Sequence, residues 1–580
     1  MAKRNKSILI TGLLFILLSS TLTAQVLYVD DATGNDLSTG TSLASAWKTI
    51  QHAMDNASAG NIVSIRGGTY HEQLTLNISG TIGNNITFTN YKGENVYIDG
   101  NNGAVTLLHI GGKNNIVIEG FIFQNTQGNN SAGVVIDGIS SNITFRKNKI
   151  RNIKWTASAA TIPSSSDNCN PFVVYGNNAN IAISNISIDS NEISNNITGF
   201  SESMTLDGNI DGFSITNNLV HDNTNIGILC AGNYNVSSNP TTDHTRNGVV
   251  QNNSTYNCLS PYATSGGIYI DGGLNIIVER NKTYGNGYGI EVGCEQLGST
   301  NNITVRDNII FDNKVAGLAI GGYNYPTTGQ VLNCIIENNT LYNNDNTLSG
   351  SGEILISKVG NSVFYSNIIF TNAQNIALSS SYSGMQGNTF NYNAYYIPSG
   401  VTTNLSYSFK NANYLGLSNF QTSTAQEAAG IFTNPNFINP LVNNPATIDF
   451  SLSAGSLCID AGIPSHTNVS NEADYFHNNR VVNSIIDIGA VEFGSVSTSI
   501  KPDLKEQFFT LFPNPLIDQL SITNEKKLQI MQITVLNQMG EIVITSNTNQ
   551  PILLEALLIG FYVVTINTEK GIYSYKIMKQ

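Results

Sequence analysis

Charged side chains are scarce in this chain of 580 residues. Only 12% of the residues are Asp, Glu, Lys or Arg, and 40 acids against 27 bases give a net charge of −13. A chain this acidic, with a pI near 5.0, argues against nucleic acid as its ligand. So low a charge content is typical of a fold stabilised by stacked apolar and amide side chains.

Long apolar runs are absent beyond the first 24 residues. That N-terminal stretch has three basic residues among its first six, an apolar run from Ile8 to Leu18, and Ala24 before Gln25. This pattern predicts a secretory signal peptide over residues 1–24, which is too short for a membrane span. No cysteine follows the expected cleavage point, so a lipid anchor has no support. We expect an exported mature protein without a membrane span.

Cysteine and histidine are also rare, with six and seven residues respectively. Cys230, Cys258, Cys294 and Cys334 lie on separate repeats, and their spacing is not that of a metal site. The even number and an oxidising compartment allow disulfides. Burial as small apolar residues is an equally good interpretation.

Asparagine, in contrast, is abundant and recurs in a fixed motif. Two alternating apolar residues precede it, as in Ile186, Ile188 and Asn191, and a second asparagine usually follows five positions later. The motif returns every 27 to 43 residues, at Asn148, Asn191, Asn218, Asn253, Asn281, Asn308, Asn339 and Asn367. Aromatic residues take its place earlier, at Tyr91 and Phe121. Short strands at this period, without helices between them, predict an all-β solenoid, a right-handed parallel β-helix.

Asparagine suits such a repeat for two physical reasons. It tolerates left-handed backbone, so it fits a tight bend although it is a poor strand residue. Stacked side-chain amides also hydrogen-bond to one another along the stack, which satisfies groups that are costly to bury. About a dozen coils at ~4.8 Å each predict a rod on the order of 60 Å long.

Both ends of the solenoid carry recognisable segments. The opening contains Leu27-Tyr-Val-Asp30, Trp47-Lys-Thr-Ile50, Arg66-Gly-Gly-Thr-Tyr70 and Ile98-Asp-Gly100. It resembles the start of secreted right-handed β-helix proteins, many of them polysaccharide lyases such as the family 9 pectate lyases. The stretches 454–462 and 487–492 resemble the closing segment of such solenoids. We therefore place the β-helix domain at residues 25–494.

Three features inside this domain depart from the repeat. Strand alternation around Tyr28 predicts the first strand of the sheet. Helical spacing over Trp47–Ala57 predicts a helix that caps the open edge of the first coil. The stretch Phe390–Asn443 is less regular and predicts a loop over one face.

The chain changes character after Gly494. A Ser/Thr-rich linker, residues 495–505, precedes Phe512-Pro-Asn-Pro515, alternating strands, a Gly560-Phe-Tyr562 strand and a basic tail. The alternation predicts a small C-terminal β-sandwich over residues 506–580. This run resembles the type A C-terminal sorting domain of the type IX secretion system of Bacteroidetes. The resemblance implies the type IX machinery as a partner, and release or surface attachment after export. A carbohydrate-binding sandwich is the alternative.

Acidic residues occupy a strand that follows the asparagine motif. Alternation turns Met204, Leu206, Ile268, Ile270, Ile290, Val292, Leu318 and Ile320 inward. Asp207, Asp271 and Glu291 then share the outer face, where neighbouring coils align residues in columns ~4.8 Å apart. Carboxylates are uncommon in strands, so this face is a candidate site. Ordinary surface acids are the alternative.

A candidate reaction for this face is β-elimination in a uronate polymer. The sugar carboxylate must be neutralised, and a base must then remove the adjacent proton. Ca²⁺ favours oxygen ligands, and the candidate ligands are Glu202, Asp207, Asp211 and Asp271. The candidate catalytic groups are His244, Arg246, Lys282 and Tyr269. The excursion between Asn233 and Gly248, which carries His244, should overhang the groove, although a plain surface loop is the alternative.

The resemblance to family 9 pectate lyases implies a calcium site built of aspartates and a lysine base. Lys282 is the nearest match to that lysine. The tight Asp-Asp-x-x-Asp pattern is missing, and Asp207 with Asp211 is the closest carboxylate pair. Pectate as the substrate therefore does not follow from the resemblance.

Tyrosines near the acidic strand suit a sugar ligand, because their rings stack on sugar faces and hydrogen-bond at the tip. We predict that Tyr288, Tyr323 and Glu291 bind substrate. The sequence therefore predicts a secreted or cell-surface lyase that acts on an acidic polysaccharide. Two alternatives stay open: a glycoside hydrolase that uses Asp271 and Glu291, whose spacing on successive coils suits it, and a non-catalytic glycan binder or adhesin.

Overall fold

A computed structural model describes residues 25–580 with gaps at 323–328, 381, 442–444, 446, 465–471 and 496–508, and at short stretches of the C-terminal domain (513–515, 517, 525–527, 538–541, 548–550, 556, 558–559, 569–570 and 580). The predicted signal peptide, most of the predicted linker and Tyr323 lie outside the described residues. The chain divides into two compact units, Met1–Ser495 and Val496–Gln580.

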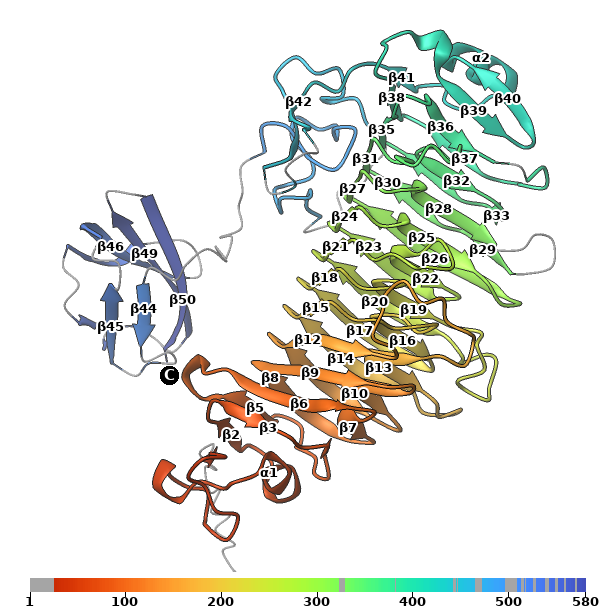
Figure 1. The fold of residues 1–580 in the computed structure, drawn as a ribbon. Helices are drawn as coiled ribbons and strands as arrows, with labels where there is room; N and C mark the ends of the chain where they lie inside the picture. The colour runs from red at the N-terminus through yellow and green to blue at the C-terminus, as the bar shows by residue number, and fades with distance from the viewer. Residues whose placement is uncertain are drawn as a thin grey trace, which may run out of the picture. The chain divides into compact units, whose positions relative to one another are not determined.

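The first unit is a parallel β-helix, as predicted, in which three long sheets are built from successive coils (Figure 1). The first sheet contains β1 (Val26–Val29), β2 (Ile62–Ile65), β5 (Ile86–Asn90), β8 (Asn114–Glu119), β11 (Ser141–Arg146), β14 (Ile183–Asp189), β17 (Ile210–Thr216), β20 (Thr245–Gln251), β23 (Leu274–Glu279), β26 (Ser299–Arg306), β30 (Ile335–Glu337), β34 (Val363–Tyr365) and β37 (Thr389–Asn391). In addition, β29 (Gln330–Leu332) pairs with β26, and β33 (Val359–Gly360) pairs with β29.

The second and third sheets stack with the same coil-by-coil order. The second contains β3 (Gly68–Tyr70), β6 (Val96–Gly103), β9 (Phe121–Gln127), β12 (Lys149–Lys154), β15 (Glu192–Ser194), β18 (Leu219–His221), β21 (Ser254–Tyr256), β24 (Lys282–Tyr284), β27 (Ile309–Phe311), β31 (Thr340–Tyr342), β35 (Ile368–Phe370), β38 (Ala394–Tyr396) and β41 (Ile431–Phe432). The third contains β4 (Leu74–Thr75), β7 (Thr106–Gly111), β10 (Ser131–Asp137), β13 (Cys169–Gly176), β16 (Met204–Gly208), β19 (Ile228–Ala231), β22 (Gly266–Asp271), β25 (Tyr288–Cys294), β28 (Ala316–Gly322), β32 (Ile354–Ile356), β36 (Ile376–Ser379), β39 (Ser406–Phe409) and β40 (Ala412–Leu415).

A helix covers the hydrophobic core at each end of the rod. The predicted N-terminal cap is α1 (Ile50–Asn56), which buries Ile50 and Met54, and β1 begins the first sheet as expected. At the other end, α2 (Leu417–Thr424) places Phe420 flat against Tyr407, with ring centroids 4.3 Å apart. The expected loop at Phe390–Asn443 is therefore wrong in part, because this stretch also completes the last coil.

The asparagines form a continuous buried ladder at the turn between the first and second sheets. Asn281 is typical: its Nδ2 donates to Asn308 Oδ1 (3.0 Å) and to the Val250 carbonyl (2.9 Å). Its Oδ1 accepts from the backbone and side-chain nitrogens of Asn253. Every polar atom of the amide is thus satisfied in the core. A second ladder, five residues further on, includes the pairs Asn196–Asn223 and Asn286–Asn313.

The left-handed backbone lies one residue before the first ladder, not on the ladder asparagines themselves. Positive φ angles occur at Lys147, Ser190, Asn217, Asn252, Arg280, Asp307, Asn338, Ser366 and Tyr392. The bend is therefore made by a variable residue, and the asparagine is required for its hydrogen bonds. The expectation that ladder asparagine itself adopts the left-handed conformation is wrong.

We predict that Asn281→Ala lowers the free energy of unfolding by about 3 kcal/mol, because it leaves buried amide groups of Asn253 without an acceptor. Asn275→Gly is the matched control, because Asn275 has a φ of 54° that glycine adopts without steric strain. Asn275 lies on the same coil and in a parallel ladder with Asn247 and Asn302, but it is exposed. We expect a loss below about 0.5 kcal/mol there. Urea denaturation measures both, and equal losses would contradict a special role for the buried ladder.

The six cysteines are all free and buried. They therefore pack as small apolar residues, the second of the two interpretations of the sequence. Among the described residues, no helix is long and apolar enough to span a membrane.

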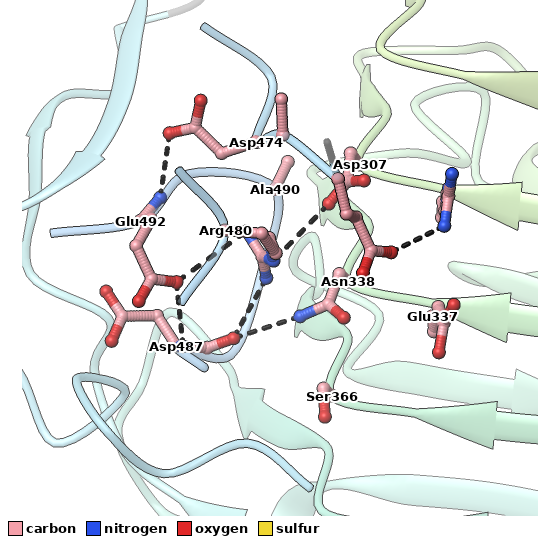
Figure 2. A network of polar contacts seen from close by, with 12 residues as sticks. Asp307, Glu337, Asn338, Ser366, Asp474, Arg480, Asp487, Ala490 and Glu492 are labelled. Carbon is pink, nitrogen blue, oxygen red and sulfur yellow. Dashed lines mark hydrogen bonds and ion pairs between the residues drawn. The ribbon is translucent and has the colours of Figure 1, made fainter. Parts of the chain in front are cut away.

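A closing segment, the described residues of 433–493, follows β41 and packs on the outer side of the second sheet. It contains the antiparallel pair β42 (Phe437–Asn439) and β43 (Asp449–Leu452). Arg480 anchors the segment, is 1% exposed, and donates through Nη2 to the carbonyls of Asp487 (3.0 Å) and Gly489 (2.6 Å). Its guanidinium also lies 3.6 Å from Asp307 and 4.0 Å from Glu492 (Figure 2).

Burial raises the pKa of both carboxyl groups around Arg480, to about 7 for Asp307 and to about 8 for Glu492, although the arginine acts in the opposite direction. Main-chain bonds complete the attachment: Gly489 donates to the Ser366 carbonyl at 2.8 Å. The closing segment is thus fastened to the turns that carry the first asparagine ladder.

The second unit consists of two small antiparallel sheets. One contains β44 (Phe509–Phe512), β45 (Gln519–Asn524) and β48 (Ile552–Leu553), and the other contains β46 (Ile530–Leu536), β47 (Ile542–Ser546), β49 (Gly560–Thr568) and β50 (Gly571–Lys579). Its own core contains Phe509, Leu520, Val535, Val564 and Ile577. These sheets confirm the predicted small C-terminal β domain.

Candidate active site

The third sheet aligns the predicted acids on its outer face. Register places Asp207 in one column with Asp271, separated by Ala231 on the intervening coil. The neighbouring column contains Tyr269 and, one coil further, Glu291. The residues predicted to face inward are buried at 3% exposure or less: Met204, Leu206, Ile268, Ile270, Ile290, Val292, Leu318 and Ile320.

This face is covered, because the expected excursion lies over it. The Tyr234 hydroxyl donates to Asp271 Oδ2 and lies 3.4 Å from Glu295 Oε2. Asp243 holds the excursion in shape by accepting from the backbone nitrogens of Asn235 (2.6 Å) and Ser237 (2.8 Å). As a result Asp271 is only 1% exposed, and Asp207 9%.

Five carboxyl groups gather under and beside this cover. We call Glu202, Asp207, Asp271, Glu291 and Glu295 the acidic cluster. Asp271 Oδ1 accepts from the Glu295 backbone nitrogen at 2.8 Å, and Glu202 Oε2 accepts from the Thr205 hydroxyl at 3.1 Å. Glu202, Glu291 and Glu295 are half-buried, so solvent reaches the cluster on their side.

Burial is the main cause of high pKa values in the acidic cluster. It raises the pKa of Asp207 and of Asp271 to about 7, with further increases from Asp243 and Glu295 respectively. Burial and the neighbouring Asp207 raise the pKa of Glu202 to about 8. Burial, then Glu295 and Asp271, hold the pKa of Glu291 well above its usual range. At neutral pH the cluster therefore contains both protonated and ionised carboxyl groups.

Asp207 differs from the other members in one respect. Its Oδ1 is buried and has no hydrogen-bond partner. A carboxyl oxygen withdrawn from water without a partner is costly, so such an atom is a strong indicator of a functional role. A ligand that brings a hydrogen atom to Oδ1 removes this cost.

Tyrosines supply neutral hydroxyl groups around the acidic cluster. Burial raises the pKa of Tyr175 and Tyr262 to about 12, with a contribution from Glu202. Burial and neighbouring carboxylates also raise the pKa of Tyr234 and Tyr269. All four remain protonated at neutral pH, and Tyr234 and Tyr269 donate to Asp271 and Glu295 respectively.

Several predicted site residues lie away from the acidic cluster. Arg246 (β20) belongs to the first sheet, where its Nε lies 3.1 Å from Asp211 Oδ2, and Asn247 binds the other Asp211 oxygen. Lys282 (β24) belongs to the second sheet, where its Nζ donates to the Pro445 carbonyl at 2.5 Å. Lys282 therefore lies on another sheet than the acids, and Asp211 and Arg246 lie on the first sheet and pair with each other, so their roles at the acidic cluster stay predictions.

The remaining predicted residues lie closer. The His244 ring is buried and its Nδ1 lies 2.7 Å from the Gly272 carbonyl, immediately after Asp271. Tyr288 begins β25 and is half-buried. Sequence reasoning missed Tyr234 and Glu295. A signal for Glu295 was present, because it directly follows Cys294 at the end of the strand that carries Glu291.

Comparisons with known proteins fit this architecture. A family model for a right handed beta helix region matches residues 240–329, and one for a secretion system C-terminal sorting domain matches residues 510–580. The uncharacterized protein YwoF of Bacillus subtilis (strain 168) is 33% identical over 480 residues, which cover 76% of this chain and 97% of YwoF. This chain belongs to the YwoF family.

Beyond the YwoF match, the sorting domain confirms the predicted route: the protein is exported by the type IX secretion system to the cell surface or the medium. Two solved structures are similar to this chain. Pectate lyase Pel9A is 15% identical, with 81% of this chain and 96% of that chain covered and a TM-score of 0.42. XylC in complex with xylose is 11% identical, with 81% and 99% covered and a TM-score of 0.45. Neither likeness bears on the reaction of this YwoF-family chain.

Proposed function

We propose that this YwoF-family protein is an exported enzyme that cleaves an acidic polysaccharide at the acidic cluster, by β-elimination beside a uronate. The observation that carries the proposal is the buried Oδ1 of Asp207, which has no hydrogen-bond partner and lies among carboxyl groups that hold protons at neutral pH.

Asp207 has the properties of a general base. Its pKa of about 7 leaves it partly ionised at neutral pH while making it a better proton acceptor than an ordinary carboxylate. The ionised Asp207 carboxylate then takes the proton from the carbon next to the uronate carboxylate. The electron pair of that C–H bond forms the new double bond, and the glycosidic oxygen leaves.

Protonated members of the acidic cluster meet the second requirement. Glu202, with a pKa of about 8, and Glu291 keep their protons at neutral pH. They therefore donate hydrogen bonds to a substrate carboxylate instead of repelling it. In this proposal the hydroxyl of Tyr234 or Tyr269, which otherwise donates to Asp271 or Glu295 respectively, gives a proton to the leaving oxygen.

Hydrolysis is the second candidate reaction. Burial raises the pKa of Asp207, Glu291 and Glu295, and neighbouring acids add to the rise at Asp207 and Glu291. No described lysine, arginine or histidine is among the groups acting on them. Carboxyl groups would then supply both acid and base. Asp207 and Asp271 lie two coils apart, about 10 Å between their backbones. This separation is close to the roughly 6.5–9.5 Å of inverting glycosidases.

Calcium fits the acidic cluster poorly in the described structure. The oxygen donors are suitable, but Asp211 is engaged by Arg246 and Asn247, and no group of three His, Cys, Asp or Glu residues in the described part converges on one point. We therefore derive no step through calcium, which stays a prediction for the assay below.

The test is a screen of pectate, alginate and glycosaminoglycans with the purified mature protein. We expect unsaturated chain ends, which absorb ultraviolet light, on at least one polymer. New reducing ends without absorbance would instead show hydrolysis. Parallel reactions with added Ca²⁺ and with EDTA decide the calcium prediction. Binding without either product on every polymer would overturn the proposed enzyme and leave a glycan-binding protein.

A further inference from the structure

A second cavity lies at the corner between the second and third sheets, apart from the acidic cluster. Its volume is about 800 Å³, and the turns after β12, β15, β18 and β21 line it. Four successive coils at ~4.8 Å per step make it about 14 Å long. A groove of this length fits several sugar units rather than one.

Two cations from β12 line this groove. Both Nε and Nη2 of Arg151 donate to Gln124 Oε1, at 3.0 and 2.8 Å, which fixes the guanidinium and leaves its remaining N–H groups available. Within the described part of the chain, nothing pairs with the Lys154 ammonium. Lys149 on the same strand, in contrast, forms an ion pair, with its Nζ 2.8 Å from Glu192 Oε2.

Asp222 is the one acidic residue among the described residues that line the groove, and its carboxylate oxygens already have hydrogen-bond partners. Asp222 Oδ1 accepts from Asn257 Nδ2 at 2.9 Å, and its Oδ2 lies 2.7 Å from His221 Nδ1. Both carboxylate oxygens are thus engaged, whereas the two cations are not neutralised. In a chain with a net charge of −13, such a groove favours an anion.

We propose that this groove binds the carboxylate groups of an acidic oligosaccharide, with Arg151 and Lys154 as the charged contacts. Amides and hydroxyls in the lining, from Asn152, Asn195 and Ser260, suit sugar hydroxyl groups. The inference rests on the acidic substrate class of the proposed function and adds a second binding region outside the reacting centre.

The position of the groove allows one polymer to reach both sites. Pro261 lines the groove, and the next residue, Tyr262, has a pKa that Glu202 of the acidic cluster raises. Tyr262 also stacks on Phe200, with centroids 4.7 Å apart. This aromatic pair therefore stands between the groove and the acidic cluster.

The test is calorimetric titration of the full chain with short oligogalacturonates and with uncharged xylo-oligosaccharides of similar length. We expect the double variant Arg151→Gln/Lys154→Gln to bind the charged ligand at least about tenfold more weakly, because two charge-assisted contacts are lost. Lys147→Gln, on the same coil but exposed and outside the lining, is the control and should bind normally.

Three results would contradict the proposal that the groove binds acidic oligosaccharides. They are unchanged affinity in the double variant, equal binding of the neutral ligand, and no binding of the acidic ligand. Asp207→Asn separates this proposal from the proposed function, since it should remove turnover and keep the affinity of the groove. The two proposals can also fail separately. If the double variant abolishes binding of the charged ligand but no polymer is turned over, the groove proposal stands and the proposed enzyme function is refuted.

Discussion

Asp207→Asn should reduce turnover by about 10²–10⁴-fold, the usual contribution of a positioned general base, while the protein stays folded. The amide has the size and shape of the carboxyl group but cannot take a proton at neutral pH. Initial rates on the polymer found in the screen measure the effect. A variant that keeps most of its activity would remove Asp207 from the mechanism.

The same substitution should make the protein more stable at pH 8. The pKa of Asp207 is raised from 3.8 to about 7 in the folded state, so the stability that the protonated group contributes is complete below about pH 4. It is lost as the pH rises toward and through 7. A rise of this size corresponds to about 4 kcal/mol, and the neutral amide avoids the loss.

Chemical denaturation at pH 5 and pH 8 measures this difference. The advantage of Asp207→Asn over the unmodified protein should grow with pH. Asp189→Asn is the control, because Asp189 is half-buried and accepts from the Thr216 hydroxyl and the Asn217 amide, both at 2.7 Å, and these partners do not titrate between pH 5 and pH 8. A parallel pH response in both variants would contradict the burial of Asp207.

Arg480→Met should lower the free energy of unfolding of the β-helix by about 3–5 kcal/mol, the typical result of removing one partner from a buried ion pair. The substitution removes one of the three arginines that stabilise the ionised form of Asp307, which is itself 1% exposed, and it removes the donor from Arg480 to the carbonyls of Asp487 and Gly489. We also expect the closing segment to become sensitive to proteases, because Arg480 joins it to the coil turns (Figure 2).

The double variant Asp307→Asn/Arg480→Met tests the cause. It removes the uncompensated buried charge, so it should recover at least half of the stability that Arg480→Met loses. Denaturation curves measure the recovery, and limited proteolysis reports on the closing segment. A double variant no better than Arg480→Met would show that packing of the long side chain, and not charge, is what matters.

The repeat itself predicts most of the fold and part of the site. Alternation around each ladder asparagine correctly separates inward Leu206 and Ile270 from outward Asp207 and Asp271, because a strand offers only two faces. Alternation does not say which sheet a residue near a turn belongs to. Asp211 and Lys282 were therefore expected beside the acids although they lie across corners of the coil.

The cover over the acidic cluster was harder to predict. Tyr234 belongs to an irregular excursion whose path depends on the contacts of Asp243, and such contacts leave no period in the sequence. Glu295 lies just past a strand end, where alternation stops. The chemistry of the site thus depends on the segments that the repeat does not govern.

The two buried asparagine ladders have a direction, and each one stops at a glutamate. Their amides donate to the next coil, except where Cys258 takes the asparagine position in the second ladder, until Asn393 donates to Glu427 and Asn344 donates to Glu353. A carboxylate can accept but, unlike an amide, has no N–H to pass onward. The two glutamates therefore end the ladders. A coil duplicated before them should continue the ladder and lengthen the β-helix. A coil added after them would find no side-chain amide to hydrogen-bond with.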